Sequence, residues 1–560
     1  MILKSPWLDR RVFAALALFL AGSCSSGDRA SEVHSVLLVT LDTTRADALS
    51  GDAASRTLAP RIAALADEGV RFPLAYSVAP LTLPAHASLL TGLVPPRHGL
   101  RDNGQAALPE SAETLAETLA RHGFETGAFV SSVVLDRGFG LEQGFELYDQ
   151  PELGPRAAGH AQVERPARET ARAAAEWLAR RDGERPFFLW VHLYDAHVPY
   201  RPAAEHLARA GGDAYRGEIA ALDDALGALL DALAERGLDG ETLVVLTADH
   251  GESLGEHGEP THGALCYEAA LRVPLLFRFP GVPPAPGPTR LASLVDLTPT
   301  LLALLELPVP AGLDGVALFA ADAPRERGVY FESYSGYLHY GWSPLAGWLD
   351  GRGKYLHSSA PEFYLPSQDP SEAKDLALSR AADCAHARER LAELLARPAL
   401  EHEPGTESEA LARALSALGY ARGGDPSALP APLAPCELPS PMARAGELEP
   451  LLRAHALFEA QRFAECRPIV EEMVRENPRH LLALDLLALC QMHAREFERA
   501  EGSLRRRLEL AEAADARLNL GLCRFELGDA AGALRELEAA ERLAPDQPAI
   551  EEALERVRGR

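Results

Sequence analysis

One hydroxyl with catalytic potential lies in the stretch P-L-T-L-P-A-H-A-S-L-L-T-G-L-V-P-P-R-H-G-L-R-D-N, residues 80–103. Thr82 occupies the mouth of a small-residue loop that leads into an apolar helix start. A free hydroxyl is a poor nucleophile, and a base or a metal ion must activate it. Taken alone, Thr82 is also consistent with an ordinary helix N-cap. Its chemistry therefore depends on which side chains the fold brings to it.

Candidate metal ligands follow two other segments of the chain. Asp42 comes directly after one apolar run, and Asp249 and His250 come directly after another. These are ligand types that zinc and manganese accept, and calcium is a further option for the carboxylates. With Thr82 they would form a four-ligand site in which the ion lowers the pKa of the hydroxyl. The D-H-G segment alone could be an ordinary turn. The metal site is therefore predicted from Asp42, Thr82, Asp249 and His250 taken together.

The elements around these residues alternate between strand and helix patterns. Short apolar runs at 36–41, 187–193 and 242–248 read as buried strands, and aspartates follow them. Helical patterns lie between and around them, at 60–68, 112–122, 167–180 and 218–236. This alternation predicts an α/β fold with a largely parallel sheet covered by helices on both faces. Ligands gather at the carboxyl ends of such strands, where the aspartates lie.

Several ordered motifs resemble one known family. The segment from Thr82 to Asn103 resembles the nucleophile segment of the alkaline phosphatase superfamily, at the position of the sulfatase signature. Further matches follow the order of a sulfatase domain: L-D-T-T-R-A-D (41–47), D-H-G-E-S-L-G-E-H-G (249–258), Y-E-A-A-L-R-V-P-L-L (267–276), V-D-L-T-P-T-L-L (295–302), K-Y-L (354–356) and F-Y-L-P-S-Q-D-P-S-E (363–372). The resemblance implies a catalytic domain over residues 33–380 with an alkaline-phosphatase/sulfatase-like sheet.

The sequence departs from the sulfatase pattern at the nucleophile and around it. Sulfatases oxidise a Cys or Ser to formylglycine at the position of Thr82, and threonine is not a substrate for that conversion, so no formylglycine is expected. His86 replaces the arginine that follows the sulfatase nucleophile, and Thr43 replaces the second aspartate of the N-terminal pair. The lysines that help sulfatases bind sulfate have no counterpart, because none lies between Lys4 and Lys354.

These departures favour phosphoryl over sulfuryl transfer. T-x-P-x-H with a later H-G-x-x-x-N resembles the phosphodiesterase branch of the superfamily, in which threonine attacks phosphorus. The resemblance gives Asn103 the role of supporting the phosphoryl oxygens. We therefore expect a metal-dependent hydrolase or transferase acting on a phosphate mono- or diester of a small molecule, glycan or lipid. Two alternatives remain: a sulfuric ester hydrolase that works without formylglycine, and an inactive sulfatase-like scaffold that binds a partner through C-terminal repeats.

A second metal ion is an open question. Phosphodiesterases of this superfamily hold a second ion with an Asp, a nearby His and a distant His. Here Asp195, His197 and His262 offer these groups, although the spacing of Asp195 and His197 departs from the phosphodiesterase pattern. The same residues could instead contact the oxyanion of the substrate, or the histidines could be structural.

Composition and the N-terminal segment indicate the number of domains, the kinds of partner and the location of the protein. Its 560 residues predict two or three domains, and the net charge of −26 argues against a nucleic-acid partner. A basic start, an apolar run at 12–22 and the A-G-S-C sequence ending at Cys24 resemble a bacterial lipoprotein signal over residues 1–24. We expect export to the periplasmic side of the cell envelope, with Cys24 lipidated and attached to the membrane. Ala21 stands where leucine is usual, which leaves a plain cleavage site as the alternative.

The C-terminal part has a different organisation. A helical extension and a proline-rich linker are expected over 381–445. In residues 446–560, Phe463, Phe497 and Ala530 recur at 34 and 33 residues, a period that resembles tetratricopeptide repeats. Such repeats could dock a protein or peptide partner, or could be a structural or dimerising appendage. Cys466, Cys490 and Cys523 fall on apolar helical faces, and spacing alone does not show which thiols could pair.

Overall fold

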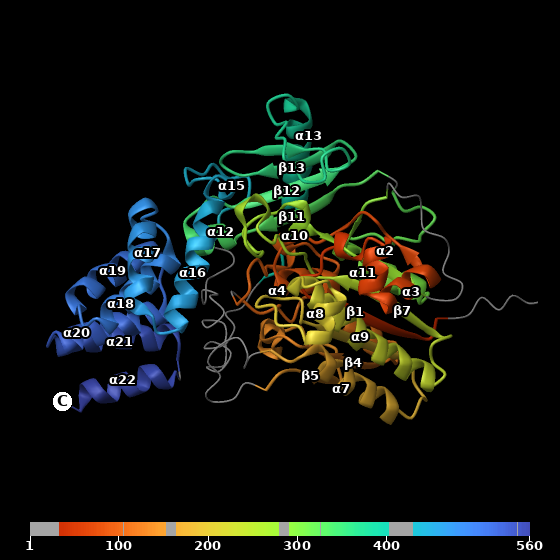
Figure 1. Cartoon of the computed structure of the whole chain (residues 1–560), viewed down its shortest axis with the longest axis horizontal. Coiled ribbons are helices and arrows are strands. Elements are labelled where there is room, and N and C mark those ends of the chain that lie inside the picture. Colours follow the sequence, from red (N-terminus) through yellow and green to blue (C-terminus); the bar gives the residue numbers. More distant parts are fainter. Residues whose placement is uncertain are drawn as a thin grey trace, which may run out of the picture.

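The computed structural model describes residues 33–104, 106–152, 164–278, 290–324, 326–401, 429–545 and 547–559. The expected signal segment with Cys24, and residues 402–428 of the expected extension and linker, lie outside these ranges. An α/β body is followed by a group of C-terminal helices at its side (Figure 1). Within the described ranges, no helix combines the length and the apolar character needed to cross a bilayer.

A seven-stranded sheet lies at the centre of the α/β body, in the order β2-β9-β7-β1-β6-β4-β5. The predicted strands appear as β1 (Ser35–Leu41), β6 (Phe187–Leu193) and β7 (Thr242–Ala248), all fully buried. They run parallel with one another and with β4 (Glu125–Phe129) and β5 (Leu147–Asp149). At the other edge, β9 (Leu275–Arg278) pairs antiparallel with β7 and with β2 (Val70–Arg71). The sheet is therefore mixed, with a parallel centre.

Helices cover both faces of this sheet, as the alternating pattern predicts. Alternate residues of a strand point to opposite faces, so Val36 and Leu38 join one apolar cluster while Leu37 and Val39 join another. The first cluster contains α4 (Thr82–Thr91), α6 (Leu115–Arg121) and α11 (Leu297–Leu304). The second contains α2 (Ala53–Leu58), α3 (Pro60–Glu68), α7 (Ala167–Arg180) and α9 (Ala214–Glu235).

Capping residues explain where two helices differ from the sequence prediction. The helix expected at 112–122 begins only at Leu115, because Thr114 and Glu117 form a capping box there. The helix expected from 218 begins earlier, at Ala214, because the Asp213 carboxylate accepts the N–H of Arg216. Shorter helices complete the body: α5 (Pro95–His98), α8 (Ala204–Arg209), α10 (Glu268–Leu271) and α12 (Ser335–Tyr340).

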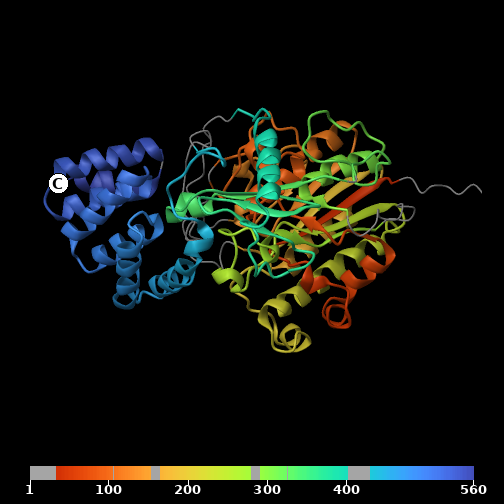
Figure 2. The same cartoon turned by 90° about the horizontal axis from the view of Figure 1, so that it is seen from above.

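Two further sheets flank the central one. An antiparallel sheet has the order β11 (Val329–Ser333), β12 (Leu345–Asp350), β13 (Gly353–His357) and β14 (Glu362–Tyr364). The helix α13 (Ala381–Leu395) packs against it, since Ala387 and Leu391 share a cluster with Tyr355 and Phe363. A small sheet joins β10 (Ala292–Ser293), β3 (Ala75–Tyr76) and β8 (Arg272–Val273). The view from above shows α13 lying across the larger of these sheets (Figure 2).

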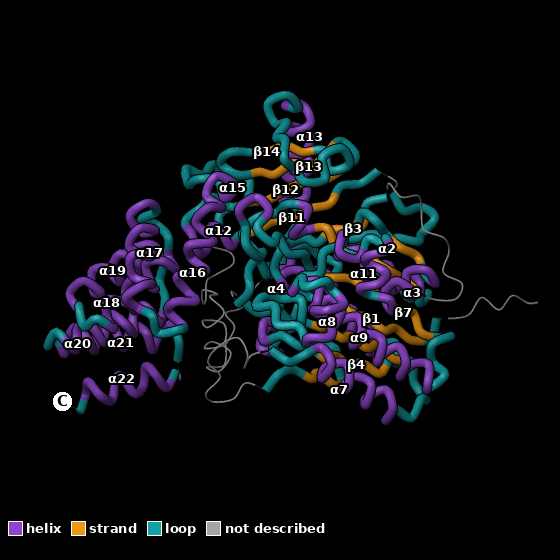
Figure 3. Tube along the Cα trace, in the orientation of Figure 1, coloured by secondary structure: helices purple, strands orange, loops and turns teal. Residues whose placement is uncertain are grey.

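The C-terminal part consists of helices joined by short loops, with no strand among the described residues (Figure 3). After α15 (Pro441–Arg444) come seven longer helices, each packed on the next along the chain. They are α16 (Leu448–Glu459), α17 (Phe463–Glu476), α18 (Leu481–His493), α19 (Phe497–Leu510), α20 (Ala514–Glu526), α21 (Ala530–Leu543) and α22 (Pro548–Arg558).

These helices are seated on α12 of the α/β body. The Asn477 side-chain amide donates a hydrogen bond of 2.8 Å to the Tyr340 carbonyl oxygen, and the Tyr340 ring lies 5.2 Å from the ring of His480. Ala445 and Leu448 share one apolar cluster with Trp342 and other residues of the α/β body. The two parts of the protein therefore meet through a continuous buried contact.

Candidate active site

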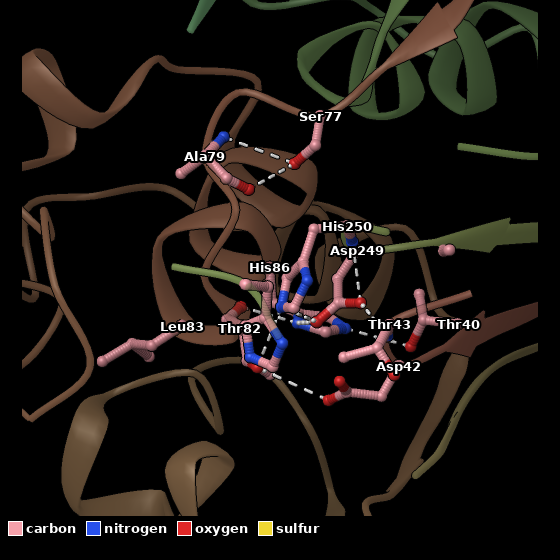
Figure 4. Close-up of polar contacts among 12 residues, drawn as sticks. Thr40, Asp42, Thr43, Ser77, Ala79, Thr82, Leu83, His86, Asp249 and His250 are labelled. Atoms are coloured by element: carbon pink, nitrogen blue, oxygen red, sulfur yellow. Dashed lines mark hydrogen bonds and ion pairs between the residues drawn. The ribbon is translucent and has the colours of Figure 1, made fainter. Parts of the chain in front are cut away.

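The structure brings the four predicted residues of the nucleophile site together. Asp42 follows β1 and Asp249 follows β7, and the parallel register pairs Leu41 with Ala248 directly before them. Thr82 is the first residue of α4, and its Oγ1 lies 3.4 Å from Asp42 Oδ2 and 3.4 Å from Nε2 of His250 (Figure 4). All four side chains are buried, so the strand ends and the helix start enclose one polar site.

Several polar atoms of this site have no hydrogen-bond partner. Asp42 Oδ1 and Asp249 Oδ2 are buried and unpaired, as is the Thr43 hydroxyl. Leaving buried carboxylate oxygens unpaired is costly, and a bound cation removes the cost. Ligand atoms of Asp42, Asp249 and His250 lie within 4.8 Å of one another. These residues therefore fit a divalent metal ion, with the Thr82 hydroxyl beside it.

The protonation states agree with such a site. Burial lowers the pKa of His250 to about 4, which keeps its imidazole neutral, the form that binds metals. Burial raises the pKa of Asp42 to about 6 and that of Asp249 to about 7. A cation beside these carboxyls would lower both values again, because it favours their charged form.

Asn103 supports the start of α4 from a distant loop. Leu81 offers no side-chain cap to this helix, and Asn103 Oδ1 accepts the N–H of Leu83 at 2.9 Å instead. Its Nδ2 is buried and has no hydrogen-bond partner. The adjacent Asp102 is held by His339 Nε2, 2.8 Å from its Oδ2. Asn103 thus combines a capping contact with a donor that remains available beside Thr82.

His192 is a site residue that the sequence analysis missed. Its Nε2 lies 3.1 Å from Asp42 Oδ2, and the N–H of Ser131 donates to its Nδ1 at 3.4 Å. Since Nδ1 accepts, Nε2 carries the proton and donates to Asp42. This leaves the other oxygen, Oδ1, free for a metal ion. The available signal was one polar residue in the apolar run F-F-L-W-V-H-L.

We expect that replacing His192 by alanine weakens metal binding by about 10–100-fold, since it removes the group that orients Asp42. Competition with a chelator of known affinity measures the change. His206→Ala is the control, because the half-buried His206 lies on α8 and pairs with Asp224 rather than with a residue of the site. Equal metal affinities for the two variants would contradict this role.

His86 occupies the place of the sulfatase arginine and has a different function. Its Nδ1 lies 2.8 Å from the Thr82 carbonyl oxygen and its Nε2 lies 3.0 Å from Thr40 Oγ1. Burial lowers the pKa of His86 to about 3, so the side chain is neutral. His98 likewise lies behind α4, where its Nε2 is 2.8 Å from Ser88 Oγ. Both histidines therefore hold α4 in place.

Of the residues proposed for a second ion, His262 lies beside His250, His197 lies next to His262, and Asp195 is turned away. The His262 ring is 4.6 Å from that of His250 and 5.0 Å from that of His197. Asp195 Oδ2 instead accepts the N–H of Ala167 at 2.6 Å, at the start of α7. Among the described residues, the clusters suited to a metal ion include none of Asp195, His197 and His262.

A buried carboxylate fixes the orientation of His262. Its Nδ1 lies 3.1 Å from Glu252 Oε1, and the Tyr200 hydroxyl donates to Glu252 Oε2 at 2.8 Å. Burial alone would lower the pKa of His262, but Glu252 outweighs it and raises the pKa to about 9. Nδ1 thus faces Glu252, and Nε2 remains available on the opposite side of the ring.

Glu259 closes the loop that carries His262. Its Oε1 accepts the N–H groups of Ala264 at 2.8 Å and Leu265 at 3.1 Å, and Oε2 accepts the Ser253 hydroxyl at 2.8 Å. Burial raises the pKa of this carboxyl to about 7. The pKa of Glu259 is thus higher in the folded protein than in the unfolded chain. Its contribution to the stability of the fold is therefore complete below about pH 4.5 and is lost as the pH rises through 7.

We therefore expect Glu259→Gln to remove this pH dependence. The stability of wild type relative to the variant should fall between pH 4.5 and 7, by at most about 3 kcal/mol. Melting temperatures of both proteins across this pH range measure it. A constant difference between the two curves would show that Glu259 stays ionised in the folded protein.

Comparison with known families identifies the α/β body. Residues 34–307 match the family described as Sulfatase. Over these residues the chain is therefore similar to a sulfatase domain of the alkaline phosphatase/sulfatase superfamily.

Individual relatives agree with this assignment. Human arylsulfatase A is 31% identical over 338 residues, which cover 49% of this chain and 66% of that protein. The choline-sulfatase of Rhizobium meliloti is 27% identical over 402 residues, covering 57% and 77%. The chain spans 58 to 66% of the length of three of its curated relatives.

A solved structure adds a likeness in fold. The phosphonate monoester hydrolase of Agrobacterium radiobacter superposes with a TM-score of 0.52 at 22% identity, covering 64% of this chain and 95% of that structure.

Proposed function

We propose that this protein is a metal-dependent hydrolase of sulfuric esters in which Thr82 is the nucleophile. The observation that carries the proposal is the Thr82 hydroxyl, 3.4 Å from both Asp42 and His250 beside unpaired carboxylate oxygens. The ester class rests on the curated relatives, such as arylsulfatase A and choline-sulfatase. These relatives favour the sulfuric ester alternative over the phosphate ester that the sequence motifs predict.

Each side chain has a part in the proposed reaction. A divalent ion held by Asp42, Asp249 and His250 would lower the pKa of the Thr82 hydroxyl and offset charge on the ester. The Thr82 oxygen attacks sulfur, and the alcohol leaves. Water then cleaves the sulfated threonine and restores the hydroxyl. Thr82 lies at the N-terminus of α4, where the helix dipole favours an anionic group.

Two further residues support the negative charge and the leaving group. Asn103 Nδ2 is the unpaired donor that we assign to the ester oxygens. His262 lies beside His250, with its Nδ1 directed to Glu252. We assign its Nε2 to donating a proton to the departing oxygen. His197 lies next to His262 and we assign it to binding the substrate.

A phosphate mono- or diester is the second candidate substrate. The supporting observation is Thr82 itself, because threonine cannot become formylglycine and the sequence around it resembles the phosphodiesterase branch. A threonine hydroxyl attacks phosphorus directly and needs no such conversion. The ion could be zinc, manganese or calcium in either case.

Relative turnover of three esters tests the ester class. The full-length chain, loaded separately with zinc, manganese and calcium, is assayed on p-nitrophenyl sulfate, p-nitrophenyl phosphate and bis-p-nitrophenyl phosphate. The proposal requires kcat/KM to be highest for the sulfate ester. A higher value for either phosphate ester would replace it by the second candidate. Metal-bound protein that turns over none of the three would favour the inactive scaffold.

We also propose that α16–α21 are three tetratricopeptide-type repeats that bind a protein or peptide partner. The first helices of successive pairs begin at Leu448, Leu481 and Ala514, and the second at Phe463, Phe497 and Ala530. This spacing supports the repeat interpretation. Export to the periplasmic side with lipidation at Cys24 remains part of the proposal, and intact mass of membrane-extracted protein tests it.

A further inference from the structure

Two cysteines lie opposite each other in the first helical hairpin of the C-terminal part. Cys466 is on α17 and Cys490 is on α18, and the short connection between these helices contains Pro478. Each cysteine is twelve residues from this proline, one before it and one after it. Residues at equal distances from the turn of an antiparallel helical hairpin lie side by side.

The side chains of this pair meet inside the protein. Cys466 is 0% exposed and Cys490 is 2% exposed, and both belong to one apolar cluster of α16–α18. Each thiol shifts the pKa of the other, which is lowered for Cys466 and raised for Cys490, so the two sulfurs are neighbours inside this cluster. A contact between sulfur atoms is the arrangement from which a disulfide forms with little movement of the backbone.

The other described cysteines are placed elsewhere. Cys523 lies in the cluster of α18, α19 and α20, and Cys266 lies in a cluster of the α/β body. Cys384 is on α13, and Cys436 precedes α15. Within the described residues, no apolar cluster other than that of Cys466 and Cys490 contains two cysteines.

We propose that Cys466 and Cys490 form a structural disulfide when the protein folds in an oxidising compartment. One thiolate attacks the disulfide of a protein or small-molecule thiol oxidant, which releases one thiol of that oxidant and leaves a mixed disulfide. The second thiolate then displaces the remaining thiol, so two electrons and two protons pass to the oxidant. Because both sulfurs are buried in the folded protein, the exchange occurs while the hairpin closes.

This bond distinguishes the pair from ordinary core cysteines. A buried thiol can act as a small apolar side chain, and Cys523 fits that description. A cross-link between α17 and α18 would restrict the unfolded chain and so stabilise the hairpin. It would form in an exported protein and stay open in a reducing cytoplasm.

Thiol trapping on the full-length chain tests the proposal. The protein is produced with its own N-terminal segment in a bacterial periplasm, denatured without reductant and alkylated. We expect two thiols to escape alkylation and a non-reducing peptide map to link Cys466 with Cys490. Reductant should release both. Complete alkylation of the two cysteines, or a link from either to another cysteine, would overturn the proposal.

Cysteine variants distinguish the effect of a Cys466–Cys490 disulfide from the effect of removing or reducing any other thiol. Cys523→Ala is the matched control, since it removes an equally buried cysteine and should leave the link intact. Cys466→Ala should expose Cys490 to alkylation. Reductant should lower the melting temperature of wild type and of Cys523→Ala, and should leave the Cys466→Ala/Cys490→Ala double variant unchanged. An equal decrease in all three proteins would also contradict the proposal.

Discussion

Replacing Thr82 by alanine is expected to lower kcat for ester hydrolysis by roughly 10³-fold or more, because removal of a nucleophile eliminates the covalent route. Metal binding should persist, since Asp42, Asp249 and His250 keep their places at the ends of β1 and β7. Steady-state kinetics on the preferred p-nitrophenyl ester and metal analysis of the same sample measure the two effects.

The serine variant is the matched control for this prediction. Thr82→Ser keeps the hydroxyl at the start of α4 and should retain measurable turnover. Full activity in the alanine variant would exclude Thr82 as the nucleophile. If the alanine variant loses both activity and bound metal, Thr82 is instead a metal ligand that the site needs in order to hold the ion.

Replacing Asp249 by asparagine is expected to have opposite effects on stability with and without metal. In wild type, Asp249 Oδ1 accepts the N–H of His250 at 2.8 Å, while Oδ2 has no hydrogen-bond partner. An asparagine can keep the first contact, but it offers an N–H donor to the ion. We therefore expect lower metal affinity and roughly a 10³-fold loss of activity.

The stability effect reverses when a chelator removes the ion. Metal-free wild type must hold the buried carboxyl groups of Asp42 and Asp249 together, and burial raises the pKa of Asp249 to about 7. Metal-free wild type should therefore lose stability as the pH rises through 7, and the neutral asparagine should not. At pH 8 the variant should melt below wild type with metal and above it without metal.

A second buried aspartate provides the control. Asp223 is fully buried and accepts the N–H groups of Arg61 and Ile62 at the start of α3. The Asp223→Asn variant should shift the melting temperature by the same amount with and without chelator. If Asp249→Asn behaves in the same way, Asp249 is a structural residue and holds no metal ion.

The strands and the main helices follow from local patterns in the sequence. The apolar runs at 187–193 and 242–248 predicted two strands with the correct first and last residues, because a buried parallel strand needs a continuous apolar segment. The helices over 60–68 and 167–180 were also correct. The beginning of α9 was missed, because the capping carboxylate of Asp213 lies outside the apolar pattern.

The site was predictable only where topology constrains it. Parallel strands must place Asp42 and Asp249 at one edge, so their proximity follows from the order of the elements. The partner of His192 is 150 residues away in the chain, and nothing in its own strand indicates it. Asp195 follows the same strand, but the free N–H at the start of α7 attracts its carboxylate.

The packing of the C-terminal helices against α12 links the conformation of these helices to that of the α/β body. Tyr340 contacts Asn477 and His480 on one side, while the preceding His339 holds Asp102 next to Asn103. A ligand that prefers one seating of α18 on α12 would change the affinity of the Thr82 site if that seating also moves Asp102 and Asn103. By reciprocity, a bound ester changes the affinity of the helices for that ligand by the same factor.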